Sequence, residues 1–468
     1  MTETAASRAK HTDVAAPVPF RKALWVWTRI ALLSFGGPAG QIAVMHRILV
    51  EEQRWIGESR FLHALNYCML LPGPEAQQLA TYIGWLMHRT KGGLAAGLLF
   101  ILPGLVSILA LSFVYALYGK TGIVSAVFFG LKTAVLAIVL QAVVRIGSRA
   151  LKSRGLVAIA ISAFLAIFVL DVPFPLIVLA AAFIGYVSNR AGVSLVPSPA
   201  RTAASSNSSD TDATSLLGEQ VPAHAQPNLS WSLRVSGVML LLWLGPVVAL
   251  AATLGPDNVF SQIGIFFSKM AVVTFGGAYA ALAYVAQEGV STYGWLQPGE
   301  MLDGLGMAET TPGPLIMVVQ FVGFLGALRE PGGLPTLLAA TLGALLTTWV
   351  TFVPCFLWIF LGAPFIERLR NNTALSAAMT AVTAAVVGVI LNLAVWFALH
   401  TLFGTVRSVP FAFGTFDIPV PETARPAAWL LTLAALIAIF RFKLGMLPVL
   451  AACSLAGAAL YAIAGVTG

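Results

Sequence analysis

Long uncharged runs in this chain decide which solvent it can fold in. Residues 92–118 and 335–361 contain no charged residue, and each exceeds the roughly 17 apolar residues that a helix needs to cross a bilayer. Over the whole chain 58% of residues are hydrophobic and 10% are charged, whereas about a quarter of the residues in a soluble domain are charged. The sequence therefore predicts an all-α integral membrane protein with the lipid bilayer as a partner.

Composition and spacing argue against several other classes of protein. The basic residues behind the net charge of +8 stand at the ends of apolar runs rather than in one patch, so we expect no nucleic-acid partner. The three cysteines, Cys68, Cys355 and Cys453, lie far apart and form no CxxC pair. The six histidines show no ligand spacing. We therefore expect no disulfide framework, no metal site, no cofactor and no enzyme activity.

The chain contains an internal repeat with an offset of 240 residues. This offset carries Phe35-Gly36-Gly37 onto Phe275-Gly276-Gly277 without a gap, and it also carries Pro72-Gly73-Pro74 onto Pro312-Gly313-Pro314. Glycine and proline are common in membrane helices, but their frequency alone does not fix the spacing between such landmarks. We interpret the two copies as two related halves of one protein.

The repeat divides the chain into four parts. These are an N-terminal tail (1–21), a first repeat (22–189), a polar linker (190–230) and a second repeat (231–468). The linker is rich in Ser, Thr, Ala and Pro and is expected to be flexible. The second repeat begins with an extra apolar segment, 231–253, before its core at 260–466. One extra crossing would turn the second half upside down, which predicts two inverted-topology repeats.

The distribution of Lys and Arg supports an inverted arrangement, because cytoplasmic loops carry the positive excess. With the amino terminus and the linker in the cytoplasm, most of the 27 basic residues lie on the cytoplasmic side. Four are expected on the outer side: Lys120, Arg329, Arg407 and Arg425. The polar first twenty residues and the interruption of the next apolar run by Arg29 argue against a cleaved signal peptide.

The FGG and PGP motifs separate apolar segments that are too short to cross a bilayer. Segments 24–36, 38–50, 59–71 and 74–88 meet in pairs at these helix breakers, which predicts re-entrant hairpins. The alternative is that the prolines kink ordinary long helices. Broken helices are tolerated where they line a cavity, and inverted-repeat transporters place their substrate there. The free N–H groups of helices that start at Gly37, Pro74, Gly277 and Pro314 would suit an anion.

Charged and polar residues near the breaks complete the predicted site. Arg29 and Lys269 correspond under the offset and lie within apolar segments, where a basic residue faces a cavity or snorkels to the interface. Lys132 has no basic counterpart, and a structural pairing there competes with a substrate contact. Glu75 is open to two interpretations, a proton carrier or a helix cap. The predicted substrate-binding residues are Arg29, Phe35, Gly36, Gly37, Pro72, Gly73, Pro74, Glu75, Gln78, Lys269, Gly276, Gly277, Glu309, Thr311, Pro312, Gly313 and Pro314.

These motifs resemble the long-chain chromate ion transporter family. The resemblance rests on Ser34-Phe35-Gly36-Gly37-Pro38, the run from Leu71 to Gly84, Thr311-Pro312-Gly313-Pro314 and Phe321-Val322-Gly323. It covers the chain except the amino terminus and the linker. It implies export of chromate, a small inorganic oxyanion, from the bacterial cytoplasm across the inner membrane, with chromate resistance as the result and sulfate as a chemical relative. The second half has Ala278 where the first has Pro38, so the two hairpins need not act alike.

Two alternatives remain open beside a chromate carrier that works by alternating access. One is a transporter of sulfate or another divalent oxyanion, because spacing does not select chromium. The other is a channel with a fixed pore, which saturable and trans-stimulated flux would exclude. The sequence is compatible with a homodimer but does not fix the oligomeric state.

Overall fold

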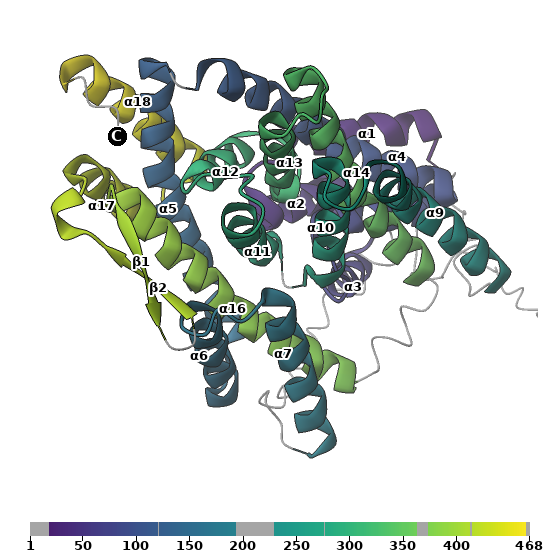
Figure 1. Ribbon diagram of the computed structural model, residues 1–468. Helices are drawn as coiled ribbons and strands as arrows, with labels where there is room; N and C mark the ends of the chain where they lie inside the picture. Colours follow the sequence, from purple (N-terminus) through teal and green to yellow (C-terminus); the bar gives the residue numbers. More distant parts are fainter. Residues whose placement is uncertain are drawn as a thin grey trace, which may run out of the picture.

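A computed structural model describes residues 18–119, 121–192, 229–275, 277–362, 373–411 and 414–464. Most of the predicted N-terminal tail and linker, together with Lys120 and Gly276, lie outside the described residues. Within the described ranges the chain is helical except for one β-hairpin (Figure 1). Helices of the first half are α1 (Phe20–Leu33), α2 (Gly37–His46), the π-helical η1 (Arg47–Glu52), α3 (Glu58–Cys68), α4 (Glu75–Tyr118), α5 (Gly122–Ala150), α6 (Arg154–Phe168) and α7 (Phe174–Arg190).

The second half begins with the extra segment that the sequence predicts, now helix α9 (Leu229–Leu254). It continues with α10 (Val259–Val273), α11 (Ala278–Ser291), α12 (Glu300–Thr310), the 3₁₀ turn η3 (Leu315–Met317), α13 (Val318–Arg329), α14 (Thr336–Gly362) and α16 (Thr373–Leu402). It ends with β1 (Val406–Phe411), β2 (Gly414–Pro419), the 3₁₀ turn η5 (Pro421–Thr423), α17 (Pro426–Phe440) and α18 (Met446–Ala464).

Six of the described helices are long and apolar enough to cross a bilayer: α4, α5, α9, α14, α16 and α18. Their outward side chains include large apolar groups, such as Leu241 at 71% exposure on α9. A surface of this kind is stable against lipid and not against water. The prediction of a multi-pass integral membrane protein is thereby confirmed.

The two halves break at corresponding places. The break between α1 and α2 corresponds to that between α10 and α11, and the break between α3 and α4 corresponds to that between α12 and η3. Helix α4 is not continuous, because His88 and Arg89 have non-helical backbone dihedral angles. The division corresponds to the loop between α13 and α14 in the second half. The short segments predicted on either side of the FGG and PGP motifs are therefore separate helical pieces.

Each half also packs its last helix pair against the other half. Helices α6 and α7 lie along α16, while α17 and α18 lie along α5 (Figure 1). Small residues allow the close approach. A Cβ on Gly185 of α7 would lie 2.5 Å from the Ala377 carbonyl oxygen of α16, and one on Gly457 of α18 would lie 2.3 Å from the Ala126 carbonyl oxygen of α5. The interface is thus reciprocal, because the last two helices of each half pack on a long helix of the other half.

The β-hairpin departs from the predicted all-α class. Strands β1 and β2 pair antiparallel from Val406 with Pro419 to Phe411 with Gly414. They connect α16 to α17 at a position where the first half has only a short turn between α5 and α6. Prolines at 410 and 419 are compatible with a two-stranded sheet because both of its strands are edge strands.

Candidate functional site

The four helix breaks meet at one place, where each PGP motif is bonded to the FGG break of the other half. The Gly73 N–H donates to the Thr274 carbonyl oxygen at 2.8 Å, and the Gly313 N–H donates to the Ser34 carbonyl oxygen at 2.9 Å. The two bonds are equivalent under the repeat, because the offset of 240 carries Gly73 onto Gly313 and Ser34 onto Thr274. The Gln41 amide adds a bond of 2.6 Å to the Gly313 carbonyl oxygen.

Glycine is required at the centre of both PGP motifs. Gly73 and Gly313 have φ angles of +121° and +115°, which residues with a Cβ rarely adopt. Space is also lacking, since a Cβ on Gly313 would lie 2.8 Å from the Gly104 Cα atom and one on Gly73 would lie 3.0 Å from the Cys355 Sγ atom. Proline on both sides prevents helix from passing through the motif. The sequence thus forces the chain to break inside the packed protein.

Four helices begin at these breaks with their first N–H groups free of side-chain caps. Helix α2 follows Gly36, α4 follows Pro74, α11 follows Gly277, and η3 with α13 follows Pro314; none of these four cap residues accepts a side-chain cap bond. The amino end of a helix carries a partial positive charge and unsatisfied donors. Together the four ends form a cluster of donors suited to an anion.

Buried polar side chains surround this cluster of donors. The Glu309 side chain is almost fully buried, and its Oε1 atom accepts a hydrogen bond of 2.6 Å from the Tyr279 hydroxyl on α11. The Arg145 charge on α5 acts on both groups. The Gln78 amide donates to the Pro72 carbonyl oxygen at 2.7 Å. Within the described ranges, one oxygen each of Glu75, Gln78 and Glu309 is buried without a hydrogen-bond partner.

The structure brings most of the predicted site residues to the breaks. Phe35, Gly36, Gly37, Pro72, Gly73, Pro74, Gly277, Pro312, Gly313 and Pro314 form the breaks themselves. The Thr311 hydroxyl donates a hydrogen bond of 3.3 Å to the Ala308 carbonyl oxygen in the last turn of α12. Gly276 lies outside the described residues.

The basic pair Arg29 and Lys269 is arranged differently from the rest of the set. Arg29 forms an ion pair of 2.7 Å with Glu52 at the far end of η1, and its side chain is 35% exposed. Lys269 is exposed on α10. The first residue ties α1 to η1, and the second faces away from the packed interior.

A buried ion-pair cluster was not recognised from the sequence. The Asp303 side chain is 3% exposed and lies 3.2 Å from the Lys132 Nζ atom. The Tyr115 hydroxyl donates to the same Asp303 oxygen at 3.0 Å. The structure thereby decides between the two interpretations of Lys132 in favour of a structural pairing. The available signal was a lysine inside an apolar segment, which requires a counter-ion.

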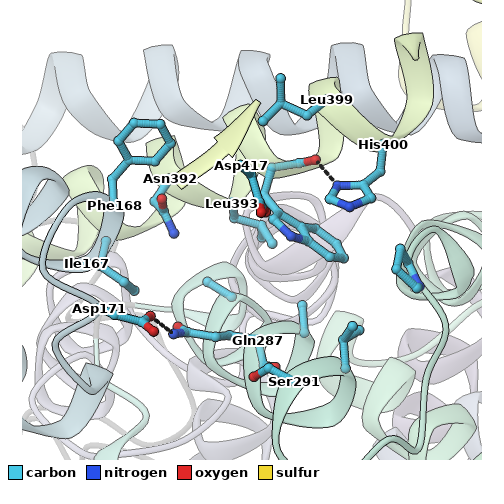
Figure 2. Close-up of a pocket in the computed structure, with 15 residues that line it drawn as sticks. Ile167, Phe168, Asp171, Gln287, Ser291, Asn392, Leu393, Leu399, His400 and Asp417 are labelled. Atoms are coloured by element: carbon cyan, nitrogen blue, oxygen red, sulfur yellow. Dashed lines mark hydrogen bonds between the residues drawn. The ribbon is translucent and has the colours of Figure 1, made fainter. Parts of the chain in front are cut away.

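A separate cavity lies at the other end of α11. It encloses about 300 Å³ between the ends of α6 and α11, the side of α16 and strand β2 (Figure 2). Its polar lining includes Asp171, which accepts a hydrogen bond of 2.9 Å from Gln287, and also Asp417 and His400. Two carboxyl groups suit an anion poorly, so this cavity is not the candidate anion site. Helix α11 nevertheless connects it to the breaks.

Comparisons with known proteins identify the family of the chain. A family model described as chromate transporter matches residues 21–186 and 261–458. The chromate transport protein of Pseudomonas aeruginosa is 31% identical over 393 residues, covering 82% of this chain and 82% of the relative. That of Cupriavidus metallidurans is 27% identical over 406 residues, covering 83% and 84%.

A probable chromate transport protein of Synechococcus elongatus is 28% identical over 365 residues, covering 77% of this chain and 80% of the relative. No solved structure matches the chain. The two matched segments coincide with the two halves that contain the breaks. The chain therefore belongs to the chromate transporter family, a family of membrane transporters and not of enzymes.

Proposed function

We propose that this protein carries chromate across the bacterial inner membrane and binds it where the four helix breaks meet. The observation that carries the proposal is the pair of exchanged bonds from Gly73 to Thr274 and from Gly313 to Ser34. Each bond joins the PGP break of one half to the FGG break of the other, and we infer that the helix ends at these breaks face one centre. A divalent oxyanion that leaves water requires donors from several directions, and opposed helix ends supply them.

The proposed mechanism is alternating access of two inverted halves. It is supported by the exchanged packing of α6 and α7 on α16 and of α17 and α18 on α5. It is also supported by helix α9, which stands before the second repeat among the described residues; one added crossing there would reverse the direction of the second repeat. In such transporters the site stays near the midplane while the two halves rock around it. The amino terminus and the linker would then share the cytoplasmic side.

Export from the cytoplasm is the proposed direction, with chromate resistance as its result. The relatives named chromate transport proteins support chromate as the substrate. We propose the break residues and Glu75, Gln78, Glu309 and Thr311 as the lining of the site. Arg29 and Lys269 are proposed to act at a distance by attracting the anion, because Arg29 is paired and Lys269 is exposed.

The second candidate substrate is sulfate, which has the same charge and tetrahedral shape. The described donors at the breaks are backbone N–H groups, and these select for charge and size rather than for the central atom. Chromate uptake into everted membrane vesicles, with sulfate as competitor, separates the two substrates. We expect saturable chromate uptake that vesicles without the protein lack. Uptake that equals that of control vesicles would contradict the proposal.

A further inference from the structure

Helix α4 begins with a carboxyl group at the place where the proposed oxyanion would bind. Glu75 is the first residue of α4. Its Oε1 atom lies 3.6 Å from the position of a Cβ on Gly277, the residue that begins α11. One side chain therefore stands at the amino ends of two helices that belong to different halves.

We propose that the Glu75 carboxylate is a built-in anion that competes with the transported oxyanion and leaves the site only when it takes up a proton. This inference rests on the proposed function. A carboxylate is attracted to helix amino ends for the same reason as an oxyanion. A dianion and a carboxylate at one poorly solvated place repel each other strongly. Binding of the oxyanion therefore requires neutral Glu75.

Among the described residues, no cation that would remove this conflict lies within ion-pair distance of Glu75. The titratable groups on the elements packed there include Cys68 of α3, which packs on α4, and Cys355 of α14, which lies against Gly73. No ion pair involving Glu75 is found among the described residues, and its Oε2 atom is buried there without a hydrogen-bond partner. The carboxyl group thus stands at two helix ends, and no described cation is paired with it.

The second half does not repeat this arrangement. The residue that corresponds to Glu75 is Leu315, the first residue of η3. Glu309 is a buried carboxyl group at the end of α12, and it accepts a hydrogen bond from Tyr279. Among the described residues, only Glu75 is a carboxyl residue at the first position of a helix that begins at a break, and this asymmetry assigns competition to Glu75.

Competition of this kind couples the oxyanion to a proton. Binding takes one proton from the water on the side that the site faces, and the proton sits on the Glu75 carboxyl oxygen. Release of the oxyanion on the other side lets Glu75 ionise and return to the helix ends, and the proton leaves with the oxyanion. A dianion with one proton keeps one net negative charge, so a membrane potential that is negative inside still drives it outward.

Chromate binding to the purified full-length protein tests the inference, measured against pH in alkaline buffers where chromate is the dianion. For the parent protein we expect affinity to rise as pH falls and about one proton to be taken up per chromate. Glu75→Gln is always neutral, so its affinity should not depend on pH and its proton uptake should vanish. At the most alkaline pH it should bind about tenfold more tightly, if the carboxylate occupies the parent site about nine-tenths of the time.

Two further variants keep the test independent of folding effects. Glu75→Ala removes the carboxylate without putting an amide in its place and should show the same loss of pH dependence. Glu330 is exposed, and Glu330→Gln should behave like the parent protein. Parent-like pH dependence and proton uptake in both Glu75 variants would overturn the inference and leave the proposed function intact. A parent protein that binds neither chromate nor sulfate at any pH would overturn both.

Discussion

At the scale of single residues, the breaks depend on positions that only glycine can occupy. Gly313 combines a φ angle of +115° with a distance of 2.8 Å from its virtual Cβ to the Gly104 Cα atom. Backbone strain and overpacking each cost roughly 1–3 kcal/mol. The bond from the Gly313 N–H to Ser34 also depends on this backbone conformation.

We therefore expect Gly313→Val to destabilise the folded protein by about 2–5 kcal/mol. The measurement is thermal unfolding in detergent, followed by size-exclusion chromatography. Gly237→Val is the matched control, because Gly237 on α9 has no atom within 4 Å of its virtual Cβ and should tolerate the change. Equal stability of the two variants would contradict the role assigned to the Gly313 backbone.

The breaks could be predicted from the sequence, whereas the partners of the charges near them could not. Glycine and proline determine backbone conformation locally, so the FGG and PGP motifs could be placed without any tertiary information. A charged side chain depends on partners that are distant in sequence. Arg29 pairs with Glu52, and Lys132 pairs with Asp303, which lies 171 residues later in the sequence. Both pairs form only when the helices pack.

At the scale of helices, the Lys132–Asp303 pair fixes α12 of the second half against α5 of the first. Asp303 is 3% exposed and lies six residues before Glu309 on the same helix. Any rocking of one half against the other must carry α12 past this contact or keep the two helices together. The pair therefore belongs to the part of the structure that positions Glu309 at the breaks.

Removal of one member of this pair should be more harmful than removal of both. We expect Lys132→Met to destabilise the protein by about 3–5 kcal/mol, because it leaves the buried Asp303 charge without its partner. Asp303→Leu should cost less, because the Lys132 side chain is 28% exposed. The double variant should lose less unfolding free energy than the two single variants lose together. Thermal unfolding of the three variants measures this coupling, and additive effects would show that the ion pair does not connect α5 to α12.

Sequence patterns predicted the helices better than the hairpin. Apolar runs and breakers indicate α4, α14 and the short helices, since membrane helices must satisfy their own backbone hydrogen bonds. Strands β1 and β2 pair with each other and contain prolines, so their pattern is weak in isolation. The packing of α6 and α7 on α16, and of α17 and α18 on α5, was also not predicted. Small residues such as Gly185 allow close helix packing, but their sequence position does not indicate which helix they contact.

At the scale of the whole molecule, the two halves are proposed to open toward opposite sides of the membrane. Glu51 and Ser291 correspond under the offset and are both exposed, close to the ends of η1 and α11. In an inverted arrangement these two positions lie on opposite faces of the membrane. In a parallel arrangement they lie on the same face.

Single cysteines at these positions distinguish the two arrangements. In a background without native cysteines, Glu51→Cys should react with a membrane-impermeant maleimide only in everted vesicles. Ser291→Cys should react only in right-side-out vesicles. Reaction of both variants from one side would contradict the inverted halves, whereas the proposed substrate would be unaffected.

One oxyanion site is proposed to be exposed to the two sides of the membrane in turn. Chromate counterflow in proteoliposomes that contain the purified protein measures this directly. Uptake of labelled chromate should saturate, and unlabelled chromate inside the vesicles should accelerate it, because the loaded site returns faster than the empty one. Uptake that increases linearly with concentration and ignores internal chromate would contradict the claim and indicate a fixed pore.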